Sequence, residues 1–334
     1  MKLSIIIVNY KTPQLVLDCI ASVCRFSTAG TEIIVVDNLS GDDTEALLQL
    51  HYPNVKFLQM NYNAGFARAN NAGISIAKGK VVLLLNSDTI VKDNAVNNAT
   101  DMLIASPDYV ACGVQLLNED GTPQISGNYA MKGGLNYLLP LPYLGKFLKT
   151  LASLLKVKKP NVPNASGIVE VDWINGAFLM VKKSAIEKAG LLDGDFFLYA
   201  EEAEWCSRLK KTGKLCIYGD EHVVHLQGVS ANDAFESAGK GYFNLFDRKG
   251  LQIILSNFVR IRKEFGAGWF FFDLFFYLLS IPVFFFGILV EKIFFIKNGT
   301  YNFSQFAGFV KNIFLLMKFT PKIISNKPYF YKVL

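Results

Sequence analysis

The chain has 334 residues, of which 51% are hydrophobic, 13% aromatic and only 19% charged. This composition excludes a disordered, collagen-like or low-complexity chain and is compatible with one large domain or two smaller ones. The net charge of +6 is unevenly distributed, because residues 231–334 hold 21 of the 28 Phe and an excess of seven positive charges. A basic, Phe-rich segment favours an anionic membrane surface over nucleic acid.

The first 115 residues alternate short apolar runs with helical stretches. In chain order, these are a strand at Ser4–Val8, a helix at Gln14–Cys24, a strand at Glu32–Val36, a helix at Asp43–Leu50 and a strand at Val81–Leu85. Apolar runs of this length between helices are typical of buried parallel strands. The predicted fold class is therefore α/β.

Ligands of such sheets bind beyond the carboxyl ends of the strands. The polar residues at those ends are the first candidates for a site: Asn9, Asp37, Asn38, Asn86 and Asp88. Neither a G-x-G-x-x-G nor a G-x-x-x-x-G-K-[ST] motif occurs, so the usual dinucleotide and P-loop modes of binding are not indicated.

The five cysteines form no C-x-x-C pair, and an odd number of them does not suggest a disulfide framework. A reducing cytosol is the simpler expectation. The apolar run that follows Lys2 is too short for a secretory signal peptide and is expected to be a strand.

The composition changes at residues 128–167, which are rich in Gly and Pro around a short basic and apolar stretch, Tyr143–Lys159. This segment is expected to be an inserted mobile loop on the acceptor side of the first domain. A polar and aromatic block, 172–230, follows it.

The Phe-rich region contains Trp269–Val290, which is long enough to span a bilayer. Asp273 and Pro282 interrupt it, and basic residues flank it on both sides. Three arrangements stay open: an interfacial or re-entrant helix, a true span, and a helical core of a soluble domain.

Three groups of residues could carry chemistry. Asp88 follows the strand at 81–85 and could ligate a divalent cation, or could cap the following turn. Glu201, Glu202 and Glu204 crowd together among aromatic residues, which suits a general base but equally suits the start of a helix. His222 and His225 would point to opposite faces of a strand, so they are not expected to share a metal.

Several motifs together resemble glycosyltransferase family 2, and within it the rhamnosyltransferase-like branch. They are, in order, Ser4–Tyr10, Val35–Ser40, Asn61–Gly73, Leu84–Asp88 and Tyr199–Glu202. The resemblance covers about residues 3–230, and its specificity lies in the ordered set.

The resemblance implies a GT-A fold, Rossmann-like, at residues 1–230 that transfers a sugar from a nucleotide diphosphate with inversion at the anomeric carbon. Residues 231–334 lie outside it and are expected to form a helical, membrane-associated region. Asp37 is implied to contact the nucleotide base, with Asn9 beside it. The remaining donor-binding residues that the resemblance implies are Asn63, Gly65, Phe66, Asn70 and Asn71.

The resemblance also implies a catalytic arrangement. Asp88 and His225 would bind Mg²⁺ or Mn²⁺, which would neutralise the leaving diphosphate. Glu202 would be the general base for the acceptor hydroxyl, and Glu201 would hydrogen-bond the acceptor. The residues expected to shape the sugar pocket are Trp173, Asn175 and Gly176, although Trp173 could equally be a core residue.

The sequence therefore predicts an inverting, metal-dependent glycosyltransferase at the cytoplasmic face of the cell membrane. The expected donor is dTDP-L-rhamnose, ahead of a UDP-hexose or UDP-galactofuranose, and the acceptor is a lipid-linked or cell-envelope polysaccharide precursor. Asn86 and Glu202 stand where the family usually has Asp. These departures motivate an alternative, a catalytically weak sugar-nucleotide or glycan-binding subunit of a polysaccharide assembly complex. A nucleotidyltransferase is a third possibility, although the chain lacks a recognisable basic phosphate loop.

Overall fold

The computed structural model describes residues 1–334 except 27–28, 158–159, 227–231, 233, 238–243 and 295–298. The chain forms two compact units, each made from several chain segments. The first unit contains Met1–Ala130, Pro160–Phe197 and Glu201–Ser230, and the second contains Met131–Lys159, Leu198–Ala200 and Ala231–Leu334.

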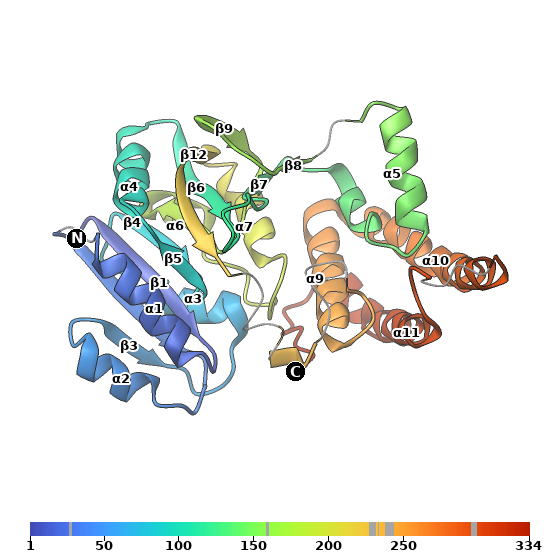
Figure 1. The fold of residues 1–334 in the computed structure, drawn as a ribbon, viewed down its shortest axis with the longest axis horizontal. Coiled ribbons are helices and arrows are strands. Elements are labelled where there is room, and N and C mark those ends of the chain that lie inside the picture. The colour runs from blue at the N-terminus through green and yellow to red at the C-terminus, as the bar shows by residue number, and fades with distance from the viewer. Residues whose placement is uncertain (27–28, 158–159, 227–231, 233, 238–243, 295–298) are drawn as a thin grey trace. The chain divides into compact units, whose positions relative to one another are not determined.

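The first unit is built on a mixed sheet with the strand order β3, β2, β1, β4, β11, β6, β12 and β5 (Figure 1). The strands are β1 (Leu3–Asn9), β2 (Thr31–Asp37), β3 (Lys56–Gln59), β4 (Val81–Leu85), β5 (Thr89–Val91), β6 (Tyr109–Leu117), β9 (Ile168–Val171), β11 (Phe178–Lys182) and β12 (Lys214–His225). β3, β2, β1 and β4 are parallel, whereas β11 runs antiparallel between β4 and β6. β9 pairs with β12. A small second sheet joins β7 (Gly127–Asn128), β8 (Asn161–Val162) and β10 (Trp173–Ile174).

Apolar side chains explain why these strands form the centre. Every residue of β4 is buried, as are Leu3–Ile7 of β1, because helices cover both faces of this part of the sheet. The helices of the first unit are α1 (Pro13–Cys24), α2 (Thr44–His51), α3 (Gly65–Ile76), α4 (Ala95–Ala105), α6 (Lys183–Ala189) and α7 (Glu201–Leu209). The α/β prediction is confirmed, and the expected elements before residue 86 match β1, α1, β2, α2 and β4 to within about two residues.

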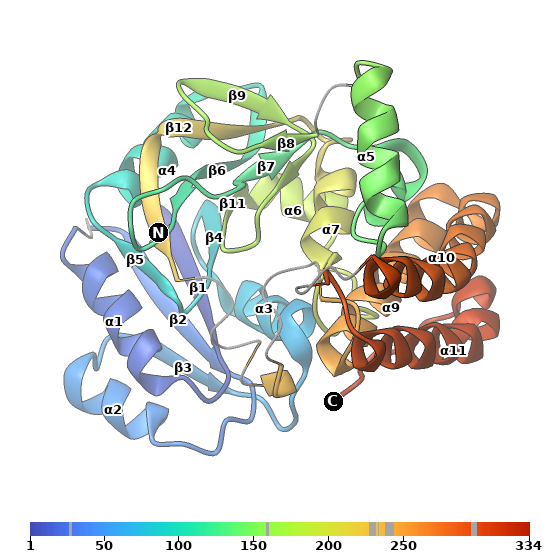
Figure 2. The same ribbon diagram turned by 45° about the vertical axis from the view of Figure 1, so that its right-hand side comes forward.

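The second unit is helical. It contains the 3₁₀ helix η1 (Lys132–Leu138), α5 (Leu144–Leu154), α9 (Arg248–Phe265), α10 (Ala267–Ile293) and α11 (Phe303–Ser325). The helices α9, α10 and α11 pack against one another around aromatic side chains (Figure 2). The ring of Phe258 on α9 lies 5.1 Å from Phe270 and 5.0 Å from Tyr277 on α10, both edge-on, which is a favourable aromatic geometry.

Two predictions from the sequence concern the second unit. The segment 128–167 contains η1 and α5 in place of a plain loop, and its mobility stays a prediction. Among the described residues, α10 is the one helix that is long and apolar enough to cross a membrane, and 33% of its most apolar stretch is buried within the protein.

Candidate active site

The carboxyl ends of β1 and β2 are joined by a buried side-chain network. Nδ2 of Asn9 lies 2.8 Å from Oδ1 of Asp37, and it also contacts the hydroxyls of Ser40 and Thr44. The other carboxylate oxygen of Asp37 accepts hydrogen bonds from the backbone N–H of Ser40 and from Nε2 of Gln59. Asn9 is fully buried and holds Asp37 in place, and its contact with a donor stays a prediction.

The loop before α3 is held by Asn38, which directly follows β2. Oδ1 of Asn38 accepts from the backbone N–H of Ala64 at 2.7 Å, and its Nδ2 donates to Oδ1 of Asn63 and to the carbonyl of Gly65. Asn38 is buried. The strand end that carries Asp37 therefore also fixes the Asn63–Gly65 turn.

Gly65 makes a close backbone approach that no other residue could make. Its φ is +69°, and a Cβ atom there would lie 2.1 Å from the carbonyl oxygen of Phe197. The same carbonyl accepts a hydrogen bond from the backbone N–H of Phe66 at 2.8 Å. The start of α3 is thereby joined to the chain that leads into α7.

The amides of Asn70 and Asn71 bond to the protein itself. Nδ2 of Asn70 donates to the carbonyl of Phe66, and Asn70 is buried. Asn71 donates to the carbonyl of Leu192 at 2.8 Å and accepts from its N–H at 3.0 Å. Asn70 therefore stabilises the first turn of α3, and Asn71 stabilises the loop before α7. Contact of either side chain with a donor sugar stays a prediction.

Glu202, at the start of α7, faces Gly176. A Cβ on Gly176 would lie 3.4 Å from Cγ of Glu202 and 3.8 Å from Cε1 of Phe66. Asn175 holds this turn, because its Nδ2 donates to the carbonyl of Ile125 and its Oδ1 accepts from the N–H of Ala177. Glu202, Gly176 and Phe66 are three predicted site residues that the fold brings together.

Glu201 lies beside Glu202 in a different environment. It is only 3% exposed, and one of its carboxyl oxygens, Oε2, has no hydrogen-bond partner among the described residues. Burial and the neighbouring charge of Glu202 raise the pKa of Glu201 well above its usual value. This environment favours the protonated form of Glu201, which can donate a hydrogen bond. Glu204, by contrast, pairs with Arg208 through two contacts of 2.7 Å.

Trp173 lies on β10, opposite Asn128 of β7 in the small sheet. It is partly buried, and its Nε1 atom is enclosed without a hydrogen-bond partner among the described residues. Oδ1 of Asn128 is enclosed and unpartnered in the same way. A buried indole N–H usually finds an acceptor, so an acceptor supplied by a bound molecule is compatible with this arrangement.

Asp88 and His225 lie together because β5 and β12 pair with Thr89 opposite His225. Both side chains are buried, and Nε2 of His225 is 3.4 Å from Oδ1 of Asp88. On the other side of the ring, Nδ1 of His225 is 3.0 Å from Oε1 of Gln124. Nε2 of Gln124 donates to the carbonyl of His225 at 2.7 Å, which identifies its Oε1 as the acceptor from Nδ1–H. Nε2 of His225 is then the nitrogen that faces Asp88.

This pair could hold a divalent cation. Among the described residues, no cluster of three or more His, Cys, Asp or Glu side chains is arranged to bind a metal. Asp88 and His225 nevertheless supply one oxygen and one nitrogen ligand at adjacent positions, and Gln124 sets the tautomer that a metal-binding imidazole needs. The residues present fit a cation whose other ligands come from a diphosphate and water.

Three further contacts connect the network at Asp37 with Asp88 and Gly176. Oδ1 of Asn9 accepts from Thr12, whose hydroxyl is 3.5 Å from that of Ser87. The N–H of Asn86 donates to the carbonyl of Ala177, the residue after Gly176. All the predicted site residues therefore belong to the first unit, and most of them meet along one edge of its sheet. The sequence did not point to Gln124 or Gln59. Asn38 was found only because it directly follows a predicted strand.

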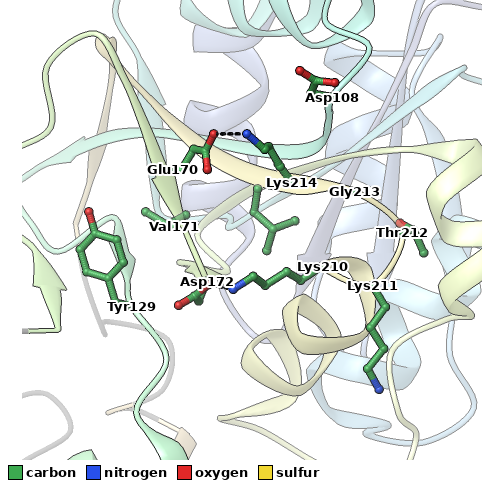
Figure 3. Close-up of a pocket in the computed structure, with 11 residues that line it drawn as sticks. Asp108, Tyr129, Glu170, Val171, Asp172, Lys210, Lys211, Thr212, Gly213 and Lys214 are labelled. Carbon is green, nitrogen blue, oxygen red and sulfur yellow. Dashed lines mark hydrogen bonds and ion pairs between the residues drawn. The ribbon is translucent and has the colours of Figure 1, made fainter.

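A hollow of about 600 Å³ lies elsewhere in the first unit (Figure 3). It is located where β12 begins, at the opposite end of that strand from His225. Four of its charged side chains form two ion pairs, Lys210 with Asp172 and Lys214 with Glu170. Because the hollow lies at the far end of β12 from His225, it is not assigned to the candidate active site.

Comparison with known proteins agrees with this geometry. Residues 4–167 match the model of glycosyl transferase family 2. This part of the chain is therefore similar to family 2. The chain is 26% identical over 220 residues to the low-salt glycan biosynthesis hexosyltransferase Agl10 of Haloferax volcanii, covering 63% of this chain and 62% of that protein. It is 25% identical over 214 residues to the N-acetylglucosaminyl-diphospho-decaprenol L-rhamnosyltransferase of Mycobacterium tuberculosis, covering 60% of this chain and 67% of that one. The match thus spans about three fifths of the length of the Haloferax relative.

The fold agrees with the similarity to family 2. The structure resembles the mannosyltransferase PcManGT of Pyrobaculum calidifontis, solved with GDP-mannose and Mn²⁺, with a TM-score of 0.54 over 97% of this chain and 83% of that chain at 13% identity. It also resembles GalNAc-T7, solved with UDP, GalNAc and Mn²⁺, with a TM-score of 0.52 over 67% of this chain and 43% of that chain at 15% identity. The predicted GT-A type of fold is confirmed.

Proposed function

We propose that the chain is an inverting, metal-dependent glycosyltransferase that moves a sugar from a nucleotide diphosphate to a lipid-linked or cell-envelope glycan. The observation that carries this proposal is the position of Glu202 against Gly176, on the sheet edge that also carries Asp37 and the Asp88–His225 pair. The match of residues 4–167 to the model of glycosyl transferase family 2 supports it.

Donor binding is assigned to the buried ends of β1, β2 and β4. Asp37, fixed by Asn9 and Gln59, would accept hydrogen bonds from the nucleotide base. Asp88 and His225 would hold Mg²⁺ or Mn²⁺, which when bound would stabilise the negative charge of the leaving diphosphate. Gln124 would keep Nε2 of His225 available as a ligand.

Transfer is assigned to the two adjacent carboxyl groups of α7. Glu202 would accept the proton of the acceptor hydroxyl as that oxygen forms its bond to the anomeric carbon. The bond from that carbon to the diphosphate breaks at the same time, on the opposite face of the sugar. Glu201, whose neutral form is favoured by burial, would donate a hydrogen bond to the acceptor. Different environments thus give two neighbouring acids different roles.

The proposed donor is dTDP-L-rhamnose, with a UDP-hexose as the next choice. The support is similarity alone: one relative is described as an L-rhamnosyltransferase that uses an N-acetylglucosaminyl-diphospho-decaprenol, and another as a hexosyltransferase. Trp173 and Asn175, on the sugar-pocket side, are proposed to select between donors. Phe66, beside Gly176, is proposed to contact the donor sugar.

We also propose that the second unit docks on a membrane with α10 in the plane of the interface. One stripe of α10 is buried on α9 and α11, including Phe270, Phe284 and Ile288. The other stripe is apolar and exposed, with Phe275 and Phe286 at 59% and 61% exposure. The remaining large exposed side chains of α10 are Phe271, Phe272, Leu278, Leu279, Phe285, Val290 and Ile293.

The packing of α9 favours this arrangement over a span. α9 lies against α10 and carries a partly buried Arg260–Glu264 ion pair together with Arg262 and Lys263. A spanning α10 would draw the charged side chains of α9 toward the hydrocarbon, where charged groups are unfavourable. An interfacial helix leaves them in the polar region, where basic residues favour an anionic surface. The five cysteine residues are compatible with the cytoplasmic face.

The deciding experiment is nucleotide release by full-length, detergent-extracted protein. Candidate donors are dTDP-L-rhamnose, UDP-galactofuranose and UDP-glucose, each tested with Mn²⁺ and with chelator, and with an N-acetylglucosaminyl-diphospho-prenol acceptor. Release of nucleotide from one donor, only with metal and with a glycosylated product, supports the proposal. Release that is insensitive to chelator would contradict the metal assignment.

The alternative is a sugar-nucleotide or glycan-binding subunit of an assembly complex. It is favoured by the small number of metal ligands, since Asn86 replaces an acidic residue and the described residues contain no larger metal cluster. Tight binding of one donor without release of nucleotide, under every condition above, would support it over catalysis.

A further inference from the structure

The two residues before Glu201 have an unfavourable backbone conformation. Tyr199 and Ala200 have φ values of 71° and 66°, in the left-handed region that residues with a side chain rarely adopt. Two such residues in succession persist only where surrounding contacts hold them. Any change in this short segment is passed directly to Glu201 and Glu202, because they are the next residues in the chain.

A buried hydrogen-bond chain on α9 holds this segment. Oγ of Ser256 donates to the carbonyl oxygen of Leu198 at 2.7 Å, and Ser256 is fully buried. Nε2 of Gln252, one turn earlier on α9, lies 3.1 Å from Oγ of Ser256. Gln252 is also fully buried. The hydroxyl of Ser256 therefore accepts a hydrogen bond from Gln252 and donates one to the carbonyl of Leu198.

Gln252 is fixed in turn by the chain near residue 332. Its Nε2 donates to the carbonyl of Tyr331 at 2.9 Å, and its Oε1 accepts from the N–H of Val333 at 3.0 Å. Tyr331 is buried. All the atoms of this chain of hydrogen bonds belong to the second unit, yet its end point, Leu198–Ala200, directly precedes α7 of the first unit.

We infer that Ser256 and Gln252 are positioning residues for the general base. By fixing the carbonyl of Leu198, they hold the left-handed turn at Tyr199–Ala200 and so set the orientation of Glu202. This inference rests on the proposed function, in which Glu202 is the base. It gives the helical unit a part in the reaction besides any contact with lipid.

The test compares Ser256→Ala with Ser280→Ala in the full-length protein. Ser280 is also fully buried, and its hydroxyl donates to the carbonyl of Tyr277 within α10, so it is a matched control. We expect Ser256→Ala to lower kcat about tenfold with an unchanged Kd for the donor, since small misplacements of a catalytic group reduce rates strongly. Hydrogen exchange should become faster in peptides covering residues 199–202, and Ser280→Ala should leave both quantities unchanged.

Gln252→Met provides a second variant, which removes the support of Ser256 while leaving its hydroxyl present. It should shift kcat and the exchange of residues 199–202 in the same direction as Ser256→Ala. Unchanged kcat and exchange in Ser256→Ala, or equal losses in Ser280→Ala, would overturn the inference. Glu202→Gln separates the two proposals: if it retains full activity the proposed base is wrong, and if it is inactive while Ser256→Ala is normal, only the positioning role is wrong.

Discussion

Nδ1 of His225 and Oε1 of Gln124 are 3.0 Å apart, and this contact decides which nitrogen of the imidazole faces Asp88. The amide of Gln124 is itself oriented by the carbonyl of His225 and by Oδ1 of Asn118. Gln124 is therefore a rigid acceptor, and the nitrogen left to face Asp88 has a free lone pair when the imidazole is neutral.

Gln124→Met should weaken Mn²⁺ binding about 10- to 100-fold, because the imidazole loses the partner that fixes its tautomer and orientation. Gln124→Glu keeps an acceptor for Nδ1–H and should bind Mn²⁺ much more tightly than Gln124→Met. The measurement is a Mn²⁺ titration followed by electron paramagnetic resonance in the presence of the donor nucleotide. Equal affinity in all three proteins would exclude this role for Gln124.

Glu202→Gln should lower kcat by about 10²- to 10⁴-fold, the range expected on removing a general base. Binding of the donor, followed by calorimetry, should stay within about twofold of the wild type, since the amide has nearly the same size. Glu201→Gln is the matched control, because an amide replaces a carboxyl group whose neutral form is favoured by burial. If the two variants lose activity equally, Glu202 is not distinguished as the base.

The unusual protonation of Glu201 predicts a dependence of stability on pH. Burial and the charge of Glu202 raise the pKa of Glu201 well above 4.5, so above that pH the unfolded chain loses a proton that the folded chain keeps. The free energy of unfolding therefore falls as pH rises through this window. Glu201→Gln removes this effect, and its Tm relative to the wild type should be higher at about pH 7.5 than at about pH 4. A constant difference would show that Glu201 is ionised in the folded protein.

Gly65→Ala should destabilise the protein far more than Gly41→Ala. Both glycines have nearly the same φ, +69° and +68°, so the conformational cost of about 1 kcal/mol is shared. At Gly65 the new methyl group would overlap the carbonyl oxygen of Phe197. At Gly41, no described atom beyond the two adjacent residues lies within 4 Å of an added Cβ. Thermal unfolding of the two variants measures the difference. Equal values of Tm would mean that the approach of α3 to Phe197 is not needed for stability.

Phe275→Asp with Phe286→Asp should reduce binding to vesicles that contain phosphatidylglycerol. These side chains are exposed on α10, and their removal lowers the apolar area available to the interface while adding repulsive charge. Leu50→Asp is the control, because Leu50 is 72% exposed but belongs to α2 of the first unit. Sedimentation with vesicles reports the bound fraction, and undiminished binding of the double variant would remove α10 as the docking surface.

Strands that form continuous apolar runs could be predicted from the sequence alone. The continuous apolar runs of β1, β2 and β4 marked these strands, and the polar residues after them, Asn9 and Asp37, meet at one sheet edge as expected. η1 and α5 were hidden by the Gly and Pro content of their segment. Long-range contacts had no local signal, since Gln124 acts through His225, 101 residues further along the chain.

The interleaving of the two units limits how the chain can be divided. A fragment starting at residue 231 would lack Met131–Lys159 and Leu198–Ala200, which are parts of the same helical unit. A chimera that exchanges only the last hundred residues with those of a relative would pair a foreign α9 with the native Leu198 carbonyl. Recombination or domain swapping in the laboratory should therefore keep residue 256 and residues 198–200 from the same parent.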